Sequence, residues 1–174
     1  MEIWQLVAQV MHKSVTEYLS KRTESQLPIP RLYPPAAGEE LVMLEQRARQ
    51  ALEPQYSAFL SLTDGMDGFS LDMPLFGCRD WGEGGRVTQG FAFLEGLRED
   101  GTPEDVGLPG GVSLFPVSVD AEGARAIFMI DCPDVLAERF WWVGEGSSSF
   151  FKTFADLLGY VIDPRSYSPR EEVD

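Results

Sequence analysis

A segment in the first half of the chain limits the fold most strongly, because two Asp-Gly pairs interrupt it three residues apart. Before them, apolar side chains recur at the spacing of one helix face: Tyr56, Phe59, Leu60 and Thr63. Pro54 suits the first turn of a helix, and Gly65 can adopt the left-handed conformation in which helices commonly end. Asp67-Gly68 then precedes an extended run. The segment predicts a short buried helix that leads directly into a sheet.

The rest of the chain predicts an α+β fold, with helices before and after a mixed, mainly antiparallel sheet of about four to six strands. Residues 112–119, 126–130 and 139–143 read as strands, and their short connections favour antiparallel pairing. In the first of them Phe115, Val117 and Val119 are expected on one face, and Pro116 indicates an edge or a bulge. Residues 126–130 are apolar on both faces, as a central strand would be. We expect three parts: an amphipathic helix (1–24), the α+β domain (25–162) and a polar tail (163–174).

The N-terminal helix has an apolar stripe: Trp4, Val7, Ala8, Met11, Val15, Tyr18 and Leu19. We expect this stripe to pack on the body of the domain, and a partner-binding or dimerising helix is the alternative. Residues 25–38 hold four prolines, which forbid a continuous helix, so an extended strap across the surface is expected.

The C-terminal half offers further signals. Ser147 to Ser149 provide N-cap oxygens for a closing helix with Phe150 in its buried stripe, and Gly159 is expected to end it. Residues 99–111 contain four acids, four glycines and two prolines, which predicts a loop with little structure of its own. The polar residues 163–174 are expected to fray.

The segment with the two Asp-Gly pairs also carries a family resemblance. The pattern Tyr56-x-x-Phe59-Leu60-x-Leu62-Thr63-Asp64-Gly65, then Asp67-Gly68-Phe69 and Pro74-Leu75-Phe76-Gly77, resembles the SUKH superfamily, and Phe150-Phe151-x-x-Phe154 extends the likeness. That group contains bacterial immunity proteins and a fungal cell-wall assembly regulator. The resemblance implies an α+β domain that neutralises a cognate toxin delivered between competing bacteria, often a nuclease or a deaminase.

Composition favours one folded domain and weighs against catalysis. The chain has 174 residues, 44% of them hydrophobic, and no apolar run approaches the roughly 20 residues of a membrane span. The N-terminus lacks the pattern of a secretory signal, so a cytoplasmic protein is expected. His12 is the only histidine, which disfavours Ser-His or Cys-His catalysis and most zinc sites. Cys78 and Cys132 lie far apart and are expected to be free thiols rather than a disulfide or a metal site. No cofactor and no enzymatic activity are expected.

The net charge of −14 restricts the partners. Residues 1–50 contain six acidic and six basic residues, so the whole excess of negative charge lies in residues 51–174. Such a field repels nucleic acid and anionic membranes and attracts basic proteins. An acidic surface that only keeps the protein soluble accounts for the charge equally well.

Three carboxylates cluster near the Asp-Gly pairs, at Asp64, Asp67 and Asp72. A calcium loop that began at Asp64 would need an acid at its third position and a glutamate at its twelfth, where the chain has Met66 and Leu75. We therefore expect these carboxylates to cap turns and helices. The alternatives are that they face a partner, or that they bind a metal or take part in acid–base catalysis.

We interpret the chain as a non-enzymatic immunity protein whose acidic loops bind a basic toxin domain. The candidate contacts are the loop acids, with one tryptophan as an anchor: Asp64, Asp67, Asp80, Trp81, Glu83, Glu99, Asp100, Glu104 and Asp105. The alternative is a regulatory or scaffold module that binds a host protein or a cell-wall sugar. Adjacent strand residues point to opposite faces, so one residue of Trp141-Trp142 is expected in the core and the other partly exposed. A carboxylate-based hydrolase is a third possibility, and the sequence predicts no oligomeric state.

Overall fold

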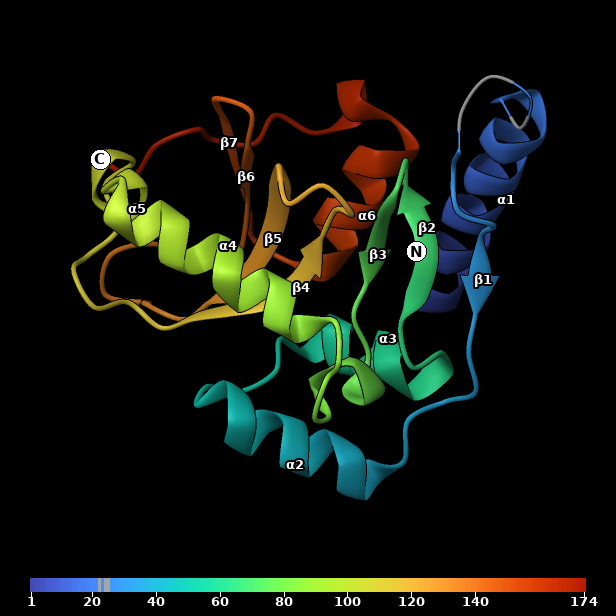
Figure 1. The fold of residues 1–174 in the computed structure, drawn as a ribbon, viewed down its shortest axis with the longest axis horizontal. Coiled ribbons are helices and arrows are strands. Elements are labelled where there is room, and N and C mark those ends of the chain that lie inside the picture. Colours follow the sequence, from blue (N-terminus) through green and yellow to red (C-terminus); the bar gives the residue numbers. More distant parts are fainter. Residues whose placement is uncertain (22, 24–25) are drawn as a thin grey trace.

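The computed structural model describes residues 1–21, 23 and 26–174 and confirms the α+β class (Figure 1). Its helices are α1 (Ile3–Lys21), α2 (Gly38–Ala48), α3 (Pro54–Leu62), α4 (Val87–Glu99), α5 (Thr102–Asp105) and α6 (Phe154–Ile162), with 3-10 turns at Cys78–Trp81 and Pro164–Ser166. Its strands are β1 (Arg31–Leu32), β2 (Met66–Ser70), β3 (Met73–Leu75), β4 (Leu114–Val119), β5 (Arg125–Ile130), β6 (Phe140–Gly144) and β7 (Ser147–Phe151).

The strands form two antiparallel sheets instead of the single mixed sheet that the sequence predicts. Within the described residues, β1–β2–β3 make a first sheet of three strands and β4–β5–β6–β7 a second sheet of four. The N–H of Phe76, just after β3, donates to the carbonyl of Val117 in β4 at 2.8 Å. This hydrogen bond joins the two sheets where the chain leaves β3.

The core fills both faces of the second sheet. One face packs on α1, α3 and α6, with side chains such as Ile127 and Phe140. The other packs on α4, with Phe128 and Trp141 among the buried side chains, and Figure 1 shows α4 lying across this sheet. Residues 126–130 are all buried in the central strand β5, as the sequence predicts.

The bulge indicated by Pro116 is confirmed and changes which face its strand presents. The register of β4 against β5 shifts between Pro116 and Ser118. Phe115 and Val117 therefore pack in the core cluster on the α3–α6 face of the sheet, which we call the first core cluster. Val119 packs in the cluster on the α4 face, the second core cluster. The prediction that these three side chains share one face is wrong for Val119, because the extra residue reverses the alternation.

The helix predicted from Pro54 is confirmed as α3, but it ends at Leu62 on an extended Thr63, and the left-handed Gly65 belongs to the turn that follows. Gly65 has φ of +92°, and a Cβ there would lie 2.6 Å from the carbonyl oxygen of Leu75. Only glycine tolerates both the conformation and the close approach.

The buried carboxylate of Glu53 fixes the start of α3 and of α6 together. Glu53 is 4% exposed, and its side chain accepts hydrogen bonds from the N–H groups of Gln55 at 3.1 Å, Tyr56 at 3.0 Å and Phe154 at 3.3 Å. The side-chain oxygen of Gln55 also accepts from the N–H of Ala155 at 3.0 Å. Glu53 therefore caps α3 and also accepts the first N–H of α6, which ties together two helices far apart in sequence.

The closing helix begins later than predicted. Ser147 to Ser149 do not cap it: they form β7, which pairs with β6 through a tight turn in which Glu145 and Gly146 have positive φ. The hydroxyl of Thr153 caps α6 instead, accepting from the N–H of Asp156 at 3.1 Å. Gly159 lies inside this helix, which continues to Ile162 because three apolar residues follow that can still pack.

The polar C-terminal residues pack on the domain, so the prediction that they fray is wrong. The N–H of Phe150 donates to the carbonyl of Arg170 at 2.8 Å, and Val173 is 8% exposed within the second core cluster. Residues 99–111, predicted as a loop, contain the one-turn helix α5.

The proline-rich connector is the predicted surface strap. Its short strand β1 pairs with β2, and the N–H of Tyr33 donates to the hydroxyl of Thr63 at 2.8 Å. The domain boundary predicted between residues 24 and 25 lies outside the described residues.

The N-terminal helix packs on the body as predicted, with Val7 and Met11 of the predicted stripe against the core, but the buried face is rotated away from the rest of that stripe. Its buried side chains are Leu6, Val7, Val10 and Ser14, facing α3, α6 and β2. Trp4 and Leu19, predicted to lie in the buried stripe, are 58% and 56% exposed.

Glu53→Ala is expected to lower the free energy of unfolding by about 2–4 kcal/mol, because it removes the cap of α3 and the acceptor for the first N–H of α6, and leaves these buried N–H groups unpaired. Glu53→Gln keeps one acceptor oxygen and should lose less. Urea unfolding followed by circular dichroism measures both, with Glu39→Ala at an exposed position of α2 as the control. Equal stability of Glu53→Ala and the wild type would contradict this role of Glu53.

Candidate protein-binding site

The acids nearest the Asp-Gly pairs hold the fold and do not face a partner. Asp64 is 8% exposed and accepts from the backbone N–H groups of Cys78 at 2.6 Å and Arg79 at 3.3 Å. Asp80 is 4% exposed and accepts from the N–H of Gly77 at 2.8 Å and from Nε of Arg86 at 2.6 Å. Both predicted contacts are therefore corrected, because their carboxylates are occupied inside the protein.

The neighbouring candidates are also largely engaged. Asp67 accepts from the hydroxyl of Tyr33 and pairs with Arg86 at 2.9 Å. The ring of Trp81 stacks on Phe115 with centroids 3.9 Å apart, so its indole packs on the core and cannot serve as a free anchor. Glu83 is exposed, in the loop before α4.

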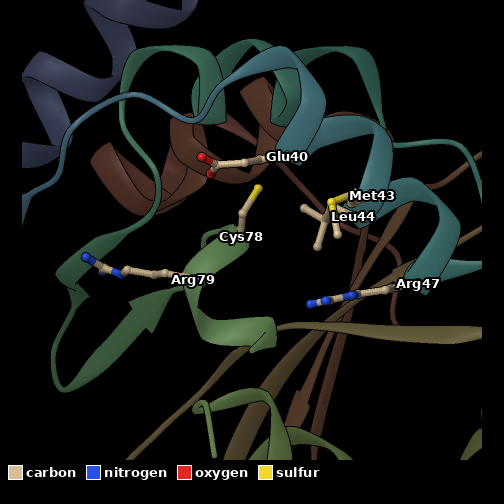
Figure 2. A pocket seen from close by; sticks show the side chains of 6 residues that line it. All are labelled: Glu40, Met43, Leu44, Arg47, Cys78 and Arg79. Carbon is tan, nitrogen blue, oxygen red and sulfur yellow. The ribbon is translucent and has the colours of Figure 1, made fainter. Parts of the chain in front are cut away.

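A small pocket lies between α2 and the 3-10 turn that starts at Cys78 (Figure 2). It has a volume of about 230 Å³ and is lined by Glu40, Met43, Leu44, Arg47, Cys78 and Arg79. Nη1 of Arg47 donates to the carbonyl of Trp81 at 2.7 Å, and the guanidinium of Arg79 lies 2.9 Å from the ring centre of Tyr33. In Figure 2 the thiol of Cys78 points toward α2, near the carboxylate of Glu40.

The pocket's cysteine is unsuited to nucleophilic chemistry. Burial, followed by the carboxylate of Asp64, raises the pKa of the Cys78 thiol to about 12. The thiol is therefore protonated at neutral pH, whereas nucleophiles and metal ligands act as thiolates. Among the described residues no three His, Cys, Asp or Glu side chains gather as metal ligands.

The exposed acids gather instead at the end of the molecule formed by α4, α5 and the C-terminus. Within the described part of the chain, eight exposed acids belong to these segments, and we call them the acidic end: Glu95, Glu99, Asp100, Glu104, Asp105, Glu171, Glu172 and Asp174. Figure 1 shows the C-terminus beside α5. Four of the predicted contacts, Glu99, Asp100, Glu104 and Asp105, are thus brought together on one surface.

Specific contacts hold the C-terminal acids in place. The N–H of Val173 donates to the carbonyl of Val106, just after α5, at 2.8 Å. Arg170 makes a bidentate pair with Glu138, at 3.2 and 2.6 Å. Burial raises the pKa of Glu138, but the hydrogen bonds and charge of Arg170, a backbone hydrogen bond and the charge of Lys152 together lower the pKa below the ordinary value. The sequence missed these acids because the segment that carries them is polar and gives no packing signal.

An apolar hollow opens beside the acidic end. It has a volume of about 370 Å³ and lies between α4–α5 and the β6–β7 hairpin, with Phe93, Leu97, Val106 and Val143 among its lining residues. Exposed Glu145 in the hairpin turn also lines it. An apolar area surrounded by a polar or charged rim is typical of protein–protein interfaces.

Comparison with protein-family models finds no match, and comparison with curated proteins finds no similar sequence. No helix of the described residues has the length and apolar content needed to cross a membrane.

Cys78 is expected to resist alkylation by iodoacetamide at pH 8, because its pKa of about 12 leaves almost no thiolate. Since this raised pKa exists only in the folded protein, alkylation should accelerate strongly in urea. Peptide mass spectrometry reports the modification of each cysteine. Rapid labelling of Cys78 in the folded protein would show that the thiol is not protected.

Arg170→Ala is expected to release the C-terminal segment, so that the Val173 amide exchanges its hydrogen at least tenfold faster while amides of β5 are unchanged. Because the pKa of Glu138 is lowered in the folded protein, the Arg170–Glu138 pair stabilises the fold above the ordinary carboxyl pKa. This stabilisation is lost as the pH falls through the lowered pKa. Hydrogen exchange at fixed pH tests the variant, with Arg165→Ala at an exposed site as the control. Unchanged exchange at Val173 would mean that other contacts hold the segment.

Proposed function

We propose that the chain is a non-enzymatic, cytoplasmic immunity protein that binds and neutralises a basic toxin domain through the acidic end. One observation carries this proposal: eight exposed carboxylates, in the described part of the chain, surround one end of the fold beside an apolar hollow. The SUKH resemblance supplies the toxin class, a nuclease or a deaminase. Either enzyme would use a cationic surface to hold its nucleic acid.

The acidic end would act first on the rate of association. Complementary charges steer two proteins together and can raise association rate constants from about 10⁵–10⁶ to about 10⁸–10⁹ M⁻¹s⁻¹ at low salt. Salt screens this effect beyond a Debye length of about 10 Å at 0.1 M. Binding by this surface should therefore weaken steeply as salt is added.

The hollow would supply the apolar part of the affinity. Charge alone rarely gives tight binding, and a few desolvated anchor side chains usually dominate an interface. The hollow between α5 and the β6–β7 hairpin is large enough for one or two inserted side chains. A basic toxin that offers an apolar or aromatic residue beside its cationic groove fits both features.

A sugar-binding regulator is the second candidate, and one observation favours it. Trp141 is fully buried, whereas Trp142 is half-buried and lines a hollow of about 240 Å³ with Tyr160, Ser147 and Ser149. Aromatic rings with nearby hydroxyl groups suit the faces and edges of a sugar. This hollow opens on the face of the β6–β7 hairpin that packs with α6.

The double variant Glu99→Lys/Glu104→Lys tests the proposal against a basic toxin domain encoded beside this gene. We expect its association rate constant to fall at least tenfold in 50 mM salt and to approach that of the wild type in 500 mM salt. Stopped-flow binding gives the rates, and growth of cells that express the toxin reports neutralisation.

The control Glu39→Lys/Glu83→Lys changes the charge equally at exposed sites outside the acidic end and should bind like the wild type. If both double variants slow association equally, net charge rather than this surface governs binding. Affinity for a cell-wall oligosaccharide that is lost in Trp142→Ala would favour the regulator.

A further inference from the structure

The longest helix of the described residues has a second apolar stripe that the fold covers only in part. The core face of α1 consists of Leu6, Val7, Val10 and Ser14, which pack on α3, α6 and β2. Beside it runs what we call the outer stripe: Trp4, Ala8, Met11, Val15 and Leu19. Trp4 and Leu19 are 58% and 56% exposed, Ala8 is exposed, and Met11 and Val15 are half-buried.

The spacing of the outer stripe matches a seam between two helices. From Trp4 to Val15 its residues stand at i, i+4, i+7 and i+11, the alternation of four and three residues that keeps side chains facing a neighbouring helix, and Leu19 follows four residues later. The small side chain of Ala8 lets a second helix approach closely. Over its 19 residues the helix is about 28 Å long, long enough for four turns of such packing.

The charge of α1 identifies a second copy of the chain as the occupant. Two chains that each carry −14 repel one another over most of their surface. Residues 1–21, however, contain two acidic and two basic residues, so this part of the chain has no net side-chain charge. A strongly acidic protein can meet its own copy at such a neutral, apolar helix face, whereas a basic partner gains nothing there.

We propose that the protein forms a dimer in which the outer stripes of two α1 helices pack together around a twofold axis. Each copy would bury its exposed Trp4 and Leu19 in this interface. Figure 1 shows α1 and α5 at opposite ends of the molecule, so the acidic end stays open in both copies. The dimer does not depend on the proposed toxin binding and would present two separate acidic ends.

Sedimentation equilibrium between 1 and 100 µM tests the dimer with charged variants. We expect the wild type to reach twice the monomer mass, and Ala8→Glu and Leu19→Glu each to weaken self-association at least tenfold. Gln9→Glu adds the same charge on the exposed polar face of α1 and should remain dimeric. Circular dichroism checks that each variant keeps the wild-type melting temperature.

Each result of the sedimentation experiment either supports or overturns the proposed dimer. A wild type that stays monomeric at 100 µM overturns the proposal, and so does a dimer that survives both outer-stripe variants. Loss of the dimer in Gln9→Glu as well would show that the polar face, rather than the outer stripe, makes the contact. Loss confined to Ala8→Glu and Leu19→Glu, without unfolding, supports the interface.

Discussion

The buried carboxylate of Glu53 is the interaction on which the rest of the fold depends. A charge removed from water needs strong compensation, and here backbone N–H groups at the starts of α3 and α6 provide it, together with the positive ends of both helix dipoles. Tyr56 and Phe154, which follow this cap, pack their rings 5.2 Å apart. The hydroxyl of Tyr56 donates to the carbonyl of Phe76 at 2.6 Å, where the two sheets meet. One carboxylate thus orients two helices and, through Tyr56, the junction of the sheets.

The other acids fall into two groups: those whose carboxylates pair with arginines inside the protein, and those that no arginine occupies. Arg86 pairs with Asp67 and Asp80, and Arg125 pairs with Asp72 and Asp120. These pairs fix the loops around β2, β3 and β5. The net charge of the surface is therefore set by the acids that no arginine occupies, and eight exposed acids of the described residues lie on α4, α5 and the C-terminal segment.

The sequence predicted local features well and long-range placement poorly. The start of α3 at Pro54, the central strand 126–130 and the bulge at Pro116 depend on backbone preference and apolar runs that neighbouring residues reveal. The strand at Ser147 was missed because three serines resemble a helix cap, and only pairing with Trp142 and Val143 makes them a strand. The sequence predicted only some of the acids that share a surface. The α4–α5 acids are close in sequence, whereas Asp64 and Asp80 are turned inward by hydrogen bonds that composition does not reveal.

The hydrogen bond between Phe150 and Arg170 has a consequence for how the chain avoids aggregation. β7 is an edge strand, and such a strand presents unpaired N–H and carbonyl groups to which the strand of another molecule can add. The C-terminal segment covers part of this edge through the bridge between Phe150 and Arg170. A segment that contributes no strand of its own thus reduces the open edge to which another molecule could add.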